Sequence, residues 1–271
     1  MQSQHITSRQ NARVKEAAKL WLSRQRERQG RFLIDGAREI LRAIDAGLEI
    51  VESFVCEPLA VDDEAQQAAA RLPETCAVRA TVTEEVYEKL CFGERTGGVL
   101  VVAKTPARGL DQLKLPAAPL VAVIEGVEKP GNVGAVLRSA DGAGVDAVVI
   151  ADPRTDLFNP NTIRASLGTV FGANVCAATG EEVLAWLRAL NLRVVAARPD
   201  AELLYTQADY RRGAAIVLGS EAEGLSERWS GAGVTGVRLP MRGKADSLNV
   251  SATAAVLFYE AQRQRQLAPG Q

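Results

Sequence analysis

Three polar loops that contain glycine carry the residues of this 271-residue chain that could do chemistry. Their sequences are EKPGNVGAVLRSA at 128–140, LGSEAEGLS at 218–226 and LPMRGKADSLNVS at 239–251. Each loop follows or includes the end of an apolar run that is typical of a buried strand. Ligands of open parallel α/β sheets bind beyond the carboxyl ends of the strands. We therefore expect the three loops to build one binding site.

The first loop has glycines that would let the backbone approach a ligand closely. Asn132 is predicted to cap the following helix, and Arg138 comes six residues later. The glycines do not form the GxGxxG pattern of dinucleotide-binding proteins, and no GK[ST] of a P-loop follows. This argues against a nicotinamide-dependent oxidoreductase. Arg138 alone could also form an ordinary ion pair on a helix surface.

The second and third loops have two interpretations when each is taken alone. Glu221 and Glu223 could be capping carboxylates of a plain strand–helix turn. Ser247, Asn249 and Ser251 could cap a helix, or they could meet a phosphate or ribose, because helix N-termini favour anions.

The remaining reactive residue types exclude other chemistry. The four cysteines form no CxxC pair, and His5 is the single histidine. We therefore expect isolated thiols, no metal site, and no catalysis of the Ser-His-Asp or Cys-His kind. Cys56, Cys76, Cys91 and Cys176 are the thiols concerned.

Composition indicates a globular protein with one basic segment. Hydrophobic residues make up 47% and charged residues 24% of the chain. No apolar run approaches the length of a membrane span, and the polar N-terminus lacks a secretory core, so we expect a cytoplasmic protein.

The net charge of −1 argues against unspecific coating of nucleic acid. Residues 1–31 nevertheless contain eight basic and two acidic residues. Among them, Arg9, Arg13 and Lys15 are candidate phosphate contacts, although a solvated helix face would look the same.

The elements that must position these residues alternate between strand and helix in two stretches. We expect a small three-layer α/β domain over 1–104, a linker over 105–118 that is rich in proline, and a second α/β domain over 119–271. The pattern predicts helices over 9–29 and 247–264, and a strand over 120–124 that is buried on both faces.

Taken together, the three loops resemble the signature motifs of the SpoU/TrmH branch of the SPOUT methyltransferases. The matches are NxGAxxRSA at 132–140, GSExxGL at 219–225 and LPMxGxxxSLNVSxxA at 239–254. The resemblance covers 119–264, and the first half is similar to the small α/β/α RNA-binding domain, like a ribosomal-protein fold, that often precedes this domain. It implies an α/β fold whose C-terminal SPOUT domain has a parallel sheet, helices on both faces and a deep trefoil knot.

The resemblance also implies S-adenosylmethionine as cofactor, a homodimer, no metal, and roles for individual positions. The family's cofactor contacts correspond to Leu218, Gly219, Ser220, Leu239, Met241 and Leu248. Its reactive residues correspond to Asn132, Arg138, Glu221, Ser247 and Asn249, and spacing favours Glu221 over Glu223.

The implied reaction is methyl transfer to a ribose 2′-hydroxyl, with large-subunit ribosomal RNA as the first expectation and transfer RNA as the second. A non-catalytic RNA-binding protein is the alternative of another class. The family proposal lets the arginine help to deprotonate the hydroxyl. Since a guanidinium is ordinarily a poor base, we prefer a role for Arg138 in alignment and in stabilising oxyanion charge. Charge reversal at Arg9, Arg13 and Lys15 is predicted to weaken RNA binding and leave cofactor affinity unchanged.

Overall fold

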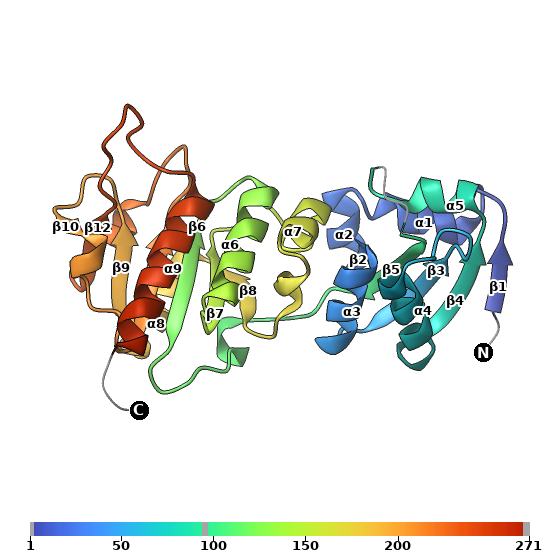
Figure 1. The fold of residues 1–271 in the computed structure, drawn as a ribbon, viewed down its shortest axis with the longest axis horizontal. Coiled ribbons are helices and arrows are strands. Elements are labelled where there is room, and N and C mark those ends of the chain that lie inside the picture. The colour runs from blue at the N-terminus through green and yellow to red at the C-terminus, as the bar shows by residue number, and fades with distance from the viewer. Residues whose placement is uncertain (1–2, 94–96, 268–271) are drawn as a thin grey trace. The chain divides into compact units, whose positions relative to one another are not determined.

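The computed structural model describes residues 3–93 and 97–267. The chain divides into two compact units, which are treated separately here (Figure 1). Unit 1 comprises residues 1–107 and 158–171, and unit 2 comprises residues 108–157 and 172–271. Because 158–171 belongs with unit 1, the chain passes from one unit to the other three times.

Unit 1 is built on a five-stranded sheet in the order β1-β4-β3-β5-β2. The pairs β1–β4 and β4–β3 are parallel, whereas β5 runs antiparallel to both β3 and β2. The strands are β1 (Ser3–Ile6), β2 (Arg31–Asp35), β3 (Ile50–Val55), β4 (Cys76–Val82) and β5 (Val99–Lys104).

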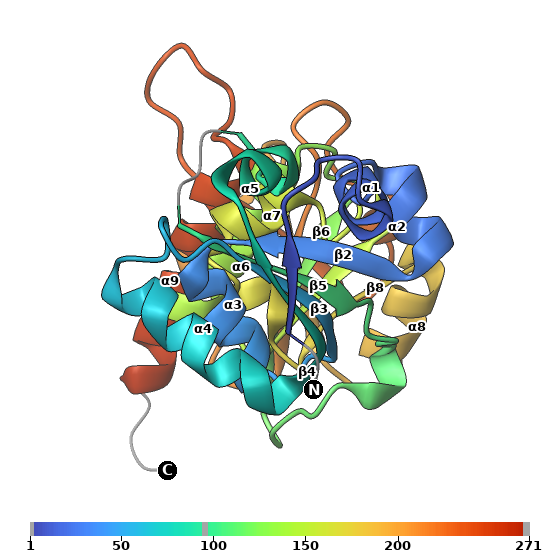
Figure 2. The ribbon, with the colours of Figure 1, turned by 90° about the vertical axis from the view of Figure 1, so that its right-hand side faces the viewer.

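Helices cover both faces of this sheet, because alternate strand residues are apolar on both sides. Leu33, Leu100 and Val102 share one buried cluster with apolar residues of α1 and α5, while α3 and α4 contact the strands from the other side (Figure 2). The helices are α1 (Ala12–Lys19), α2 (Ser23–Gln29), α3 (Ala37–Asp45), α4 (Asp63–Thr75), α5 (Glu84–Leu90) and α7 (Pro160–Ala165).

The helix predicted over 9–29 is in fact two helices. Leu22 adopts an extended backbone conformation between them, with φ −92° and ψ 128°. The buried guanidinium of Arg26 donates to the carbonyl oxygens of Leu20 and Trp21 at 2.8 and 2.9 Å. A side chain from the second helix thus satisfies carbonyls that α1 leaves open at its end, and apolar periodicity does not reveal such a contact.

The segment 158–171 packs into unit 1 through aromatic rings and a backbone contact. Phe32 is fully buried, and its ring centroid lies 4.3 Å from that of Phe158 and 6.0 Å from that of Phe171. Arg42 donates to the Leu167 carbonyl at 2.7 Å. The short helix η2 (Thr169–Phe171) ends this segment.

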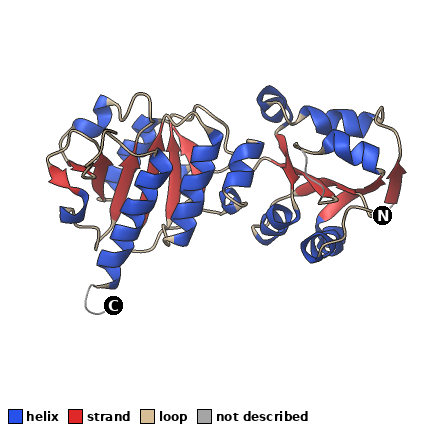
Figure 3. Cartoon of the chain, turned by 45° about the horizontal axis from the view of Figure 1, so that its top comes forward, coloured by secondary structure: helices blue, strands red, loops and turns tan. Residues whose placement is uncertain are grey.

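Unit 2 is built on a seven-stranded sheet, in which every pair is parallel, in the order β10-β12-β9-β11-β6-β7-β8 (Figure 3). The runs LVAVIE of β6 and AAIVL of β11 are buried along their whole length, as predicted for central parallel strands. The strands are β6 (Leu120–Glu125), β7 (Ala147–Ala151), β8 (Val175–Ala178), β9 (Arg193–Ala197), β10 (Leu203–Leu204), β11 (Ala214–Leu218) and β12 (Val234–Arg238).

Three long helices flank this sheet. Helices α6 (Pro130–Gly142) and α9 (Val250–Gln266) pack on each other, and α9 contacts β11. Helix α8 (Gly180–Ala189) buries Val183 and Leu187 in a separate cluster on the sheet. Three short helices, η1 (Leu110–Gln112), η3 (Tyr205–Gln207) and η4 (Glu227–Ser230), lie in the connections.

Two predicted helix starts in unit 2 are wrong. Lys129, not Asn132, is the N-cap of α6, because Pro130 fits the first turn of a helix, where no backbone N–H is needed. Helix α9 begins at Val250 rather than at 247, with Asn249 as its N-cap. No helix within the two described stretches, 3–93 and 97–267, is long and apolar enough to cross a membrane.

Candidate active site

The first two motif loops meet because their strands are neighbours. Strand β6 pairs with β11 in parallel register, from Leu120 opposite Ala214 to Ile124 opposite Leu218. The loops that follow these strands therefore leave the sheet at the same end. The strand order also reverses here, since β7 and β8 extend from β6 while β9 and β12 extend from β11. Open α/β sheets bind ligands at such a switch point.

One carboxylate oxygen joins a residue from each of the three motif loops. Glu221 Oε1 accepts hydrogen bonds from the side-chain amides of Asn132 and Asn249, the latter at 3.1 Å. Asn249 Nδ2 also lies 3.4 Å from Asn132 Oδ1. Three of the residues predicted to be reactive are thus brought together.

A second set of hydrogen bonds, to Ser251, fixes the orientation of the Asn249 side chain. Its Oδ1 accepts hydrogen bonds from the Ser251 backbone N–H at 2.9 Å and from the Ser251 hydroxyl at 2.6 Å, which caps α9. With Oδ1 committed to the helix, Nδ2 is directed toward Glu221. The start of α9 is therefore mechanically tied to the second loop.

The second loop folds back on itself around a bare glycine. Ser220 forms an isolated antiparallel bridge with Gly224, and Ser220 Oγ accepts a hydrogen bond from the Glu223 N–H at 3.1 Å. A Cβ added at Gly219 would lie 2.2 Å from the Gly224 carbonyl carbon. Gly224 itself adopts φ +67°, which favours glycine. Only glycine at 219 allows this close turn.

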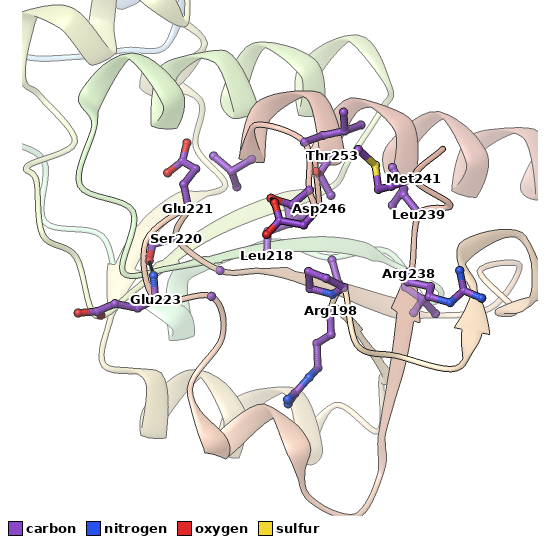
Figure 4. A pocket seen from close by; sticks show the side chains of 18 of the residues that line it. Arg198, Leu218, Ser220, Glu221, Glu223, Arg238, Leu239, Met241, Asp246 and Thr253 are labelled. Atoms are coloured by element: carbon purple, nitrogen blue, oxygen red, sulfur yellow. Dashed lines mark hydrogen bonds between the residues drawn. The ribbon is translucent and has the colours of Figure 1, made fainter. Parts of the chain in front are cut away.

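A pocket of about 360 Å³ opens beside this loop. Figure 4 shows Leu218 between Ser220 and Glu221 on one side and Leu239 and Met241 on the other. All six positions predicted to hold the cofactor line the pocket: Leu218, Gly219, Ser220, Leu239, Met241 and Leu248. Glu221 and Ser247 also line it.

The pocket includes a wall that sequence reasoning missed. Ala197 ends β9, and Arg198 and Pro199 follow it. Because β9 pairs with β11 in parallel, all three lie at the same end of the sheet. Arg198 is held by Asp200, with 3.1 Å between Arg198 Nε and Asp200 Oδ1. A strand end was predictable there, but no glycine or polar motif marks it. The other lining residues that were missed are Ala222, Glu223, Gly224, Val237, Arg238, Asp246, Val250 and Thr253.

Arg138 stands apart from the hydrogen-bonded group. It lies on α6, is exposed, and has no hydrogen-bond or ion-pair partner among residues 3–93 and 97–267. Among the described residues, no acidic side chain forms the helix-surface ion pair that was the alternative for Arg138. Arg138 does not line the pocket either, so its guanidinium is available to a ligand outside the pocket.

Arg154 links the first loop to the second, and its role was not predicted. One guanidinium nitrogen lies 2.7 Å from Glu128 and another lies 2.6 Å from Glu223. The hydrogen bonds to Glu128 and Glu223 raise the pKa of Arg154 above its ordinary value. Arg154 follows β7, the neighbour of β6.

Glu125, the last residue of β6, anchors the far end of the second loop. Its buried carboxylate accepts hydrogen bonds from the Ser226 N–H, the Ser226 hydroxyl, Arg228 and the Trp229 indole, each at 2.8 Å. Four donors on one buried carboxylate make a well-satisfied site. The loop that forms the pocket wall is thus fixed to the strand that precedes the first motif.

Arg228 extends this network to the next strand. The nitrogen that contacts Glu125 also lies 2.8 Å from Asp152 Oδ2. A hydrogen bond from the Gly180 backbone N–H and the contact with Arg228 hold the pKa of Asp152 below its usual range. Charged groups therefore join the carboxyl ends of β6 and β7, and the Gly180 backbone N–H adds the segment that follows β8.

The predicted RNA-binding residues lie in unit 1, and acidic residues accompany two of them. Arg9 donates to the Glu85 carbonyl at 2.7 Å and pairs with Glu88 at 3.2 Å. Arg13 lies 3.7 Å from Glu52. Lys15 is exposed and has no partner within the described part of the chain. Of the three, Lys15 is the cation most available to an anionic ligand.

The donor set of the pocket suits an organic cofactor with an apolar face. Leucine and methionine side chains supply that face, and the backbone around Gly219 is bare. In the described residues, no three His, Cys, Asp or Glu side chains gather as a candidate metal group.

Family models match both halves of the chain. Residues 119–259 match the SpoU rRNA Methylase family, and residues 11–101 match the MRM3-like substrate binding domain. The first match spans more than half of the chain.

Individual proteins match over nearly the full length. The 23S rRNA (uridine(2479)-2′-O)-methyltransferase of Streptomyces viridochromogenes is 29% identical, with 97% of this chain and 93% of that protein covered. A crystal structure of an RNA 2′-O ribose methyltransferase is 46% identical with a TM-score of 0.85, covering 97% and 100%. The AdoMet-bound rRNA methyltransferase from Sinorhizobium meliloti is 26% identical with a TM-score of 0.87, covering 97% and 98%.

Proposed function

The chain belongs to the SpoU rRNA methylase family, and we propose on that premise that it methylates ribose 2′-hydroxyl groups of large-subunit ribosomal RNA. It is an RNA 2′-O-methyltransferase that uses S-adenosylmethionine. One structural observation supports this assignment at the level of residues. Asn132, Glu221 and Asn249 converge beside a pocket that is lined by the backbone of Gly219.

We propose that the pocket holds S-adenosylmethionine. The fit rests on the bare backbone at Gly219, where a Cβ would collide, and on the apolar side chains of Leu218, Leu239, Met241 and Leu248. When bound, S-adenosylmethionine supplies an electrophilic methyl group on a sulfonium that becomes neutral on transfer. Ser220 would contribute its backbone and its hydroxyl O–H, because the hydroxyl oxygen accepts the Glu223 N–H but its own proton is not used by that bond.

Arg138 and the polar residues beside or at the edge of the pocket would position the nucleotide. The Arg138 guanidinium has no partner among the residues that the structure describes, and it would align the RNA phosphate and stabilise the negative charge that develops on the 2′-oxygen. Asn132 and Asn249 would orient the ribose, and Glu221 would hold both amides in place. Ser247 lines the pocket and would contact the ribose from the cofactor side. The 2′-hydroxyl that is methylated also distinguishes RNA from DNA.

We propose a division of labour along the chain. Residues 1–104 would select the RNA, 105–118 would act as a linker, and 119–271 would carry catalysis. The match of 11–101 to a substrate-binding domain supports the first part. Arg9, Arg13 and Lys15 are proposed RNA contacts, with Lys15 the strongest candidate. Transfer RNA is the second substrate candidate, and a cytoplasmic location follows from either RNA.

We also propose that unit 2 is knotted and that the enzyme is a homodimer. The strand order, with β11 inserted between β6 and β9, supports a chain that returns through its own fold. Tyr259 on α9 is 51% exposed, and Ala255 and Val256 one turn before it are apolar, which supports a partner on this face.

The decisive experiment uses methyl-labelled S-adenosylmethionine and unmodified total RNA. We expect alkali-stable label in ribosomal RNA and little in transfer RNA. Arg138→Ala should lower the methyl-transfer rate about 100-fold or more, while cofactor affinity stays within about twofold, because Arg138 lies outside the pocket. Label in transfer RNA alone would reverse the substrate choice. Cofactor and RNA binding without label in any RNA would instead support the non-catalytic alternative.

A further inference from the structure

The cations of unit 2 fall into two groups. Six arginines form ion pairs with carboxylates: Arg154, Arg193, Arg198, Arg211, Arg228 and Arg263. Lys129, Arg242 and Lys244 are instead exposed and have no hydrogen-bond or ion-pair partner for their side-chain cations in the described part of unit 2. We call these three residues the rim cations.

The rim cations lie on loops that border the candidate active site. Lys129 caps α6 and stands three residues before Asn132. Arg242 and Lys244 fall between Met241 and Asp246, which both line the pocket. Figure 1 shows the loop between β12 and α9 projecting at the same end of unit 2 as the loop between β6 and α6. The rim cations therefore lie on the two loops at the end of unit 2 that carries the candidate active site.

Three glutamates of the first two loops are already engaged, while Asp246 of the third loop accepts a hydrogen bond from the Ser247 hydroxyl at 3.5 Å. Glu128, next to Lys129 in sequence, and Glu223 both pair with Arg154. Glu221 accepts hydrogen bonds from Asn132 and Asn249. Because Glu128 and Glu223 pair with Arg154 rather than with the rim cations, the rim cations are open to an anion outside the protein.

We propose that the rim cations bind the phosphates of the nucleotides that flank the methylated ribose. The proposal rests on the proposed function, which requires a polyanionic strand to pass this pocket. Arg242 and Lys244 fall at positions that the motif LPMxGxxxSLNVSxxA leaves unspecified, and Lys129 precedes the motif NxGAxxRSA, so they would position the strand rather than take part in methyl transfer. Phosphate contacts fix register and orientation on a nucleic acid without reading its sequence.

Two double variants with the same loss of charge test this proposal. R242A/K244A removes two rim cations. R188A/R212A removes two cations that also lack partners in the described chain, but Arg188 ends α8 and Arg212 precedes β11, at the opposite ends of the strands. We would measure binding of an in vitro transcribed 23S rRNA at several salt concentrations, S-adenosylmethionine affinity, and KM and kcat for methyl transfer. Lys129→Ala serves as an independent third variant.

We expect R242A/K244A to weaken RNA binding about tenfold or more and to reduce the slope of log K against log salt by about 1 to 2, since each phosphate contact contributes a little under one unit. KM for RNA should rise, while kcat and cofactor affinity stay unchanged. R188A/R212A should change RNA binding less than twofold. Equal weakening in both double variants would overturn the rim as a specific surface, and so would a loss confined to cofactor affinity. A wild type that binds RNA through the rim but transfers no methyl group would overturn the proposed function alone.

Discussion

At the scale of single residues, the proposed cofactor pocket depends on the absence of a side chain at Gly219. The second loop returns so closely that a Cβ there would lie 2.2 Å from the Gly224 carbonyl carbon. Backbone atoms on both sides cannot move apart without breaking the Ser220–Gly224 bridge. A pocket wall made of backbone also leaves amide groups free to meet a polar ligand.

Gly219→Ala is expected to lower S-adenosylmethionine affinity at least tenfold while most of the fold survives, because the collision is confined to the loop. Calorimetric titration measures the affinity, and circular dichroism checks the fold. Gly243→Ala is the control, since a Cβ at 243 meets nothing within 4 Å and the backbone there needs no glycine. Unchanged affinity in Gly219→Ala would show that the loop relaxes and that its geometry does not shape the pocket.

Among the three basic residues predicted to touch RNA, Lys15 offers the cleanest test. Lys15→Gln should weaken RNA binding about threefold to tenfold, as expected for one lost phosphate contact. Lys19→Gln on the same helix removes the same charge, but Lys19 is already paired with Glu16 at 2.6 Å. Equal effects in a filter-binding assay would mean that only net charge matters. Reversal of Arg9 is less informative, because its bond to the Glu85 carbonyl helps to hold unit 1 together.

At the scale of elements, the site depends on connections between strand ends. The second loop is fixed at one end by the Asn132–Glu221–Asn249 group and at the other by Glu125. Arg228, which contacts Glu125, also contacts Asp152 after β7 and so connects this end of the loop to a further strand. The loop therefore has little freedom to open, and its rigidity would keep the pocket organised before any ligand arrives.

Glu125→Gln tests this attachment. The amide keeps the shape of the carboxylate but turns one acceptor into a donor facing other donors, which should cost about 1–3 kcal/mol of unfolding free energy. We also expect S-adenosylmethionine affinity to fall several-fold. Asp152→Asn is matched in chemistry and shares Arg228, yet it faces Gly180 rather than the loop, so cofactor affinity should be nearly unchanged. If Glu125→Gln and Asp152→Asn bind S-adenosylmethionine with equal affinity, Glu125 stabilises the fold but does not shape the pocket.

At the scale of the whole molecule, the outer side of α9 is the clearest surface without a partner in the described chain. Ala252 and Tyr259 are exposed, and Val256 between them is partly exposed, at the spacing of one helix face. Gly142 of α6 lies beside this stripe, since its Cβ would come 3.3 Å from the Tyr259 hydroxyl. Small residues around one exposed aromatic ring favour close approach of another helix.

Tyr259→Arg is expected to convert the proposed dimer into a monomer, because a charge would replace a half-buried ring in an apolar interface. Sedimentation equilibrium measures the mass, and methyl transfer should fall with dimer content. Leu22→Arg is the control, since Leu22 is 63% exposed but lies in unit 1. A wild type that sediments as a monomer would refute the dimer, and a variant that stays dimeric would place the interface elsewhere.

The sequence by itself determined the parts of the site that local physics encodes. Apolar runs marked β6 and β11 as buried strands, and glycines and small polar residues marked the loops after them. The positions of the six pocket residues followed from these loops through the family resemblance. The helix starts were predicted to within a few residues, since Lys129 rather than Asn132 caps α6, and α9 begins after Asn249 rather than at 247.

Only the tertiary structure decided what long-range packing brings together. Strand β11 lies beside β6 although some ninety residues of chain separate them, and no periodicity encodes that neighbour. Contacts between segments that are distant in sequence also explain why three features were not predicted. These are Arg198 in the pocket wall, Arg154 between two glutamates, and the four donors on Glu125. Such contacts also placed 158–171 with unit 1, where Phe32 needs apolar partners that its own stretch of chain does not supply. Propensities and caps act over one turn or one strand, whereas burial and charge pairing depend on which distant segments become neighbours.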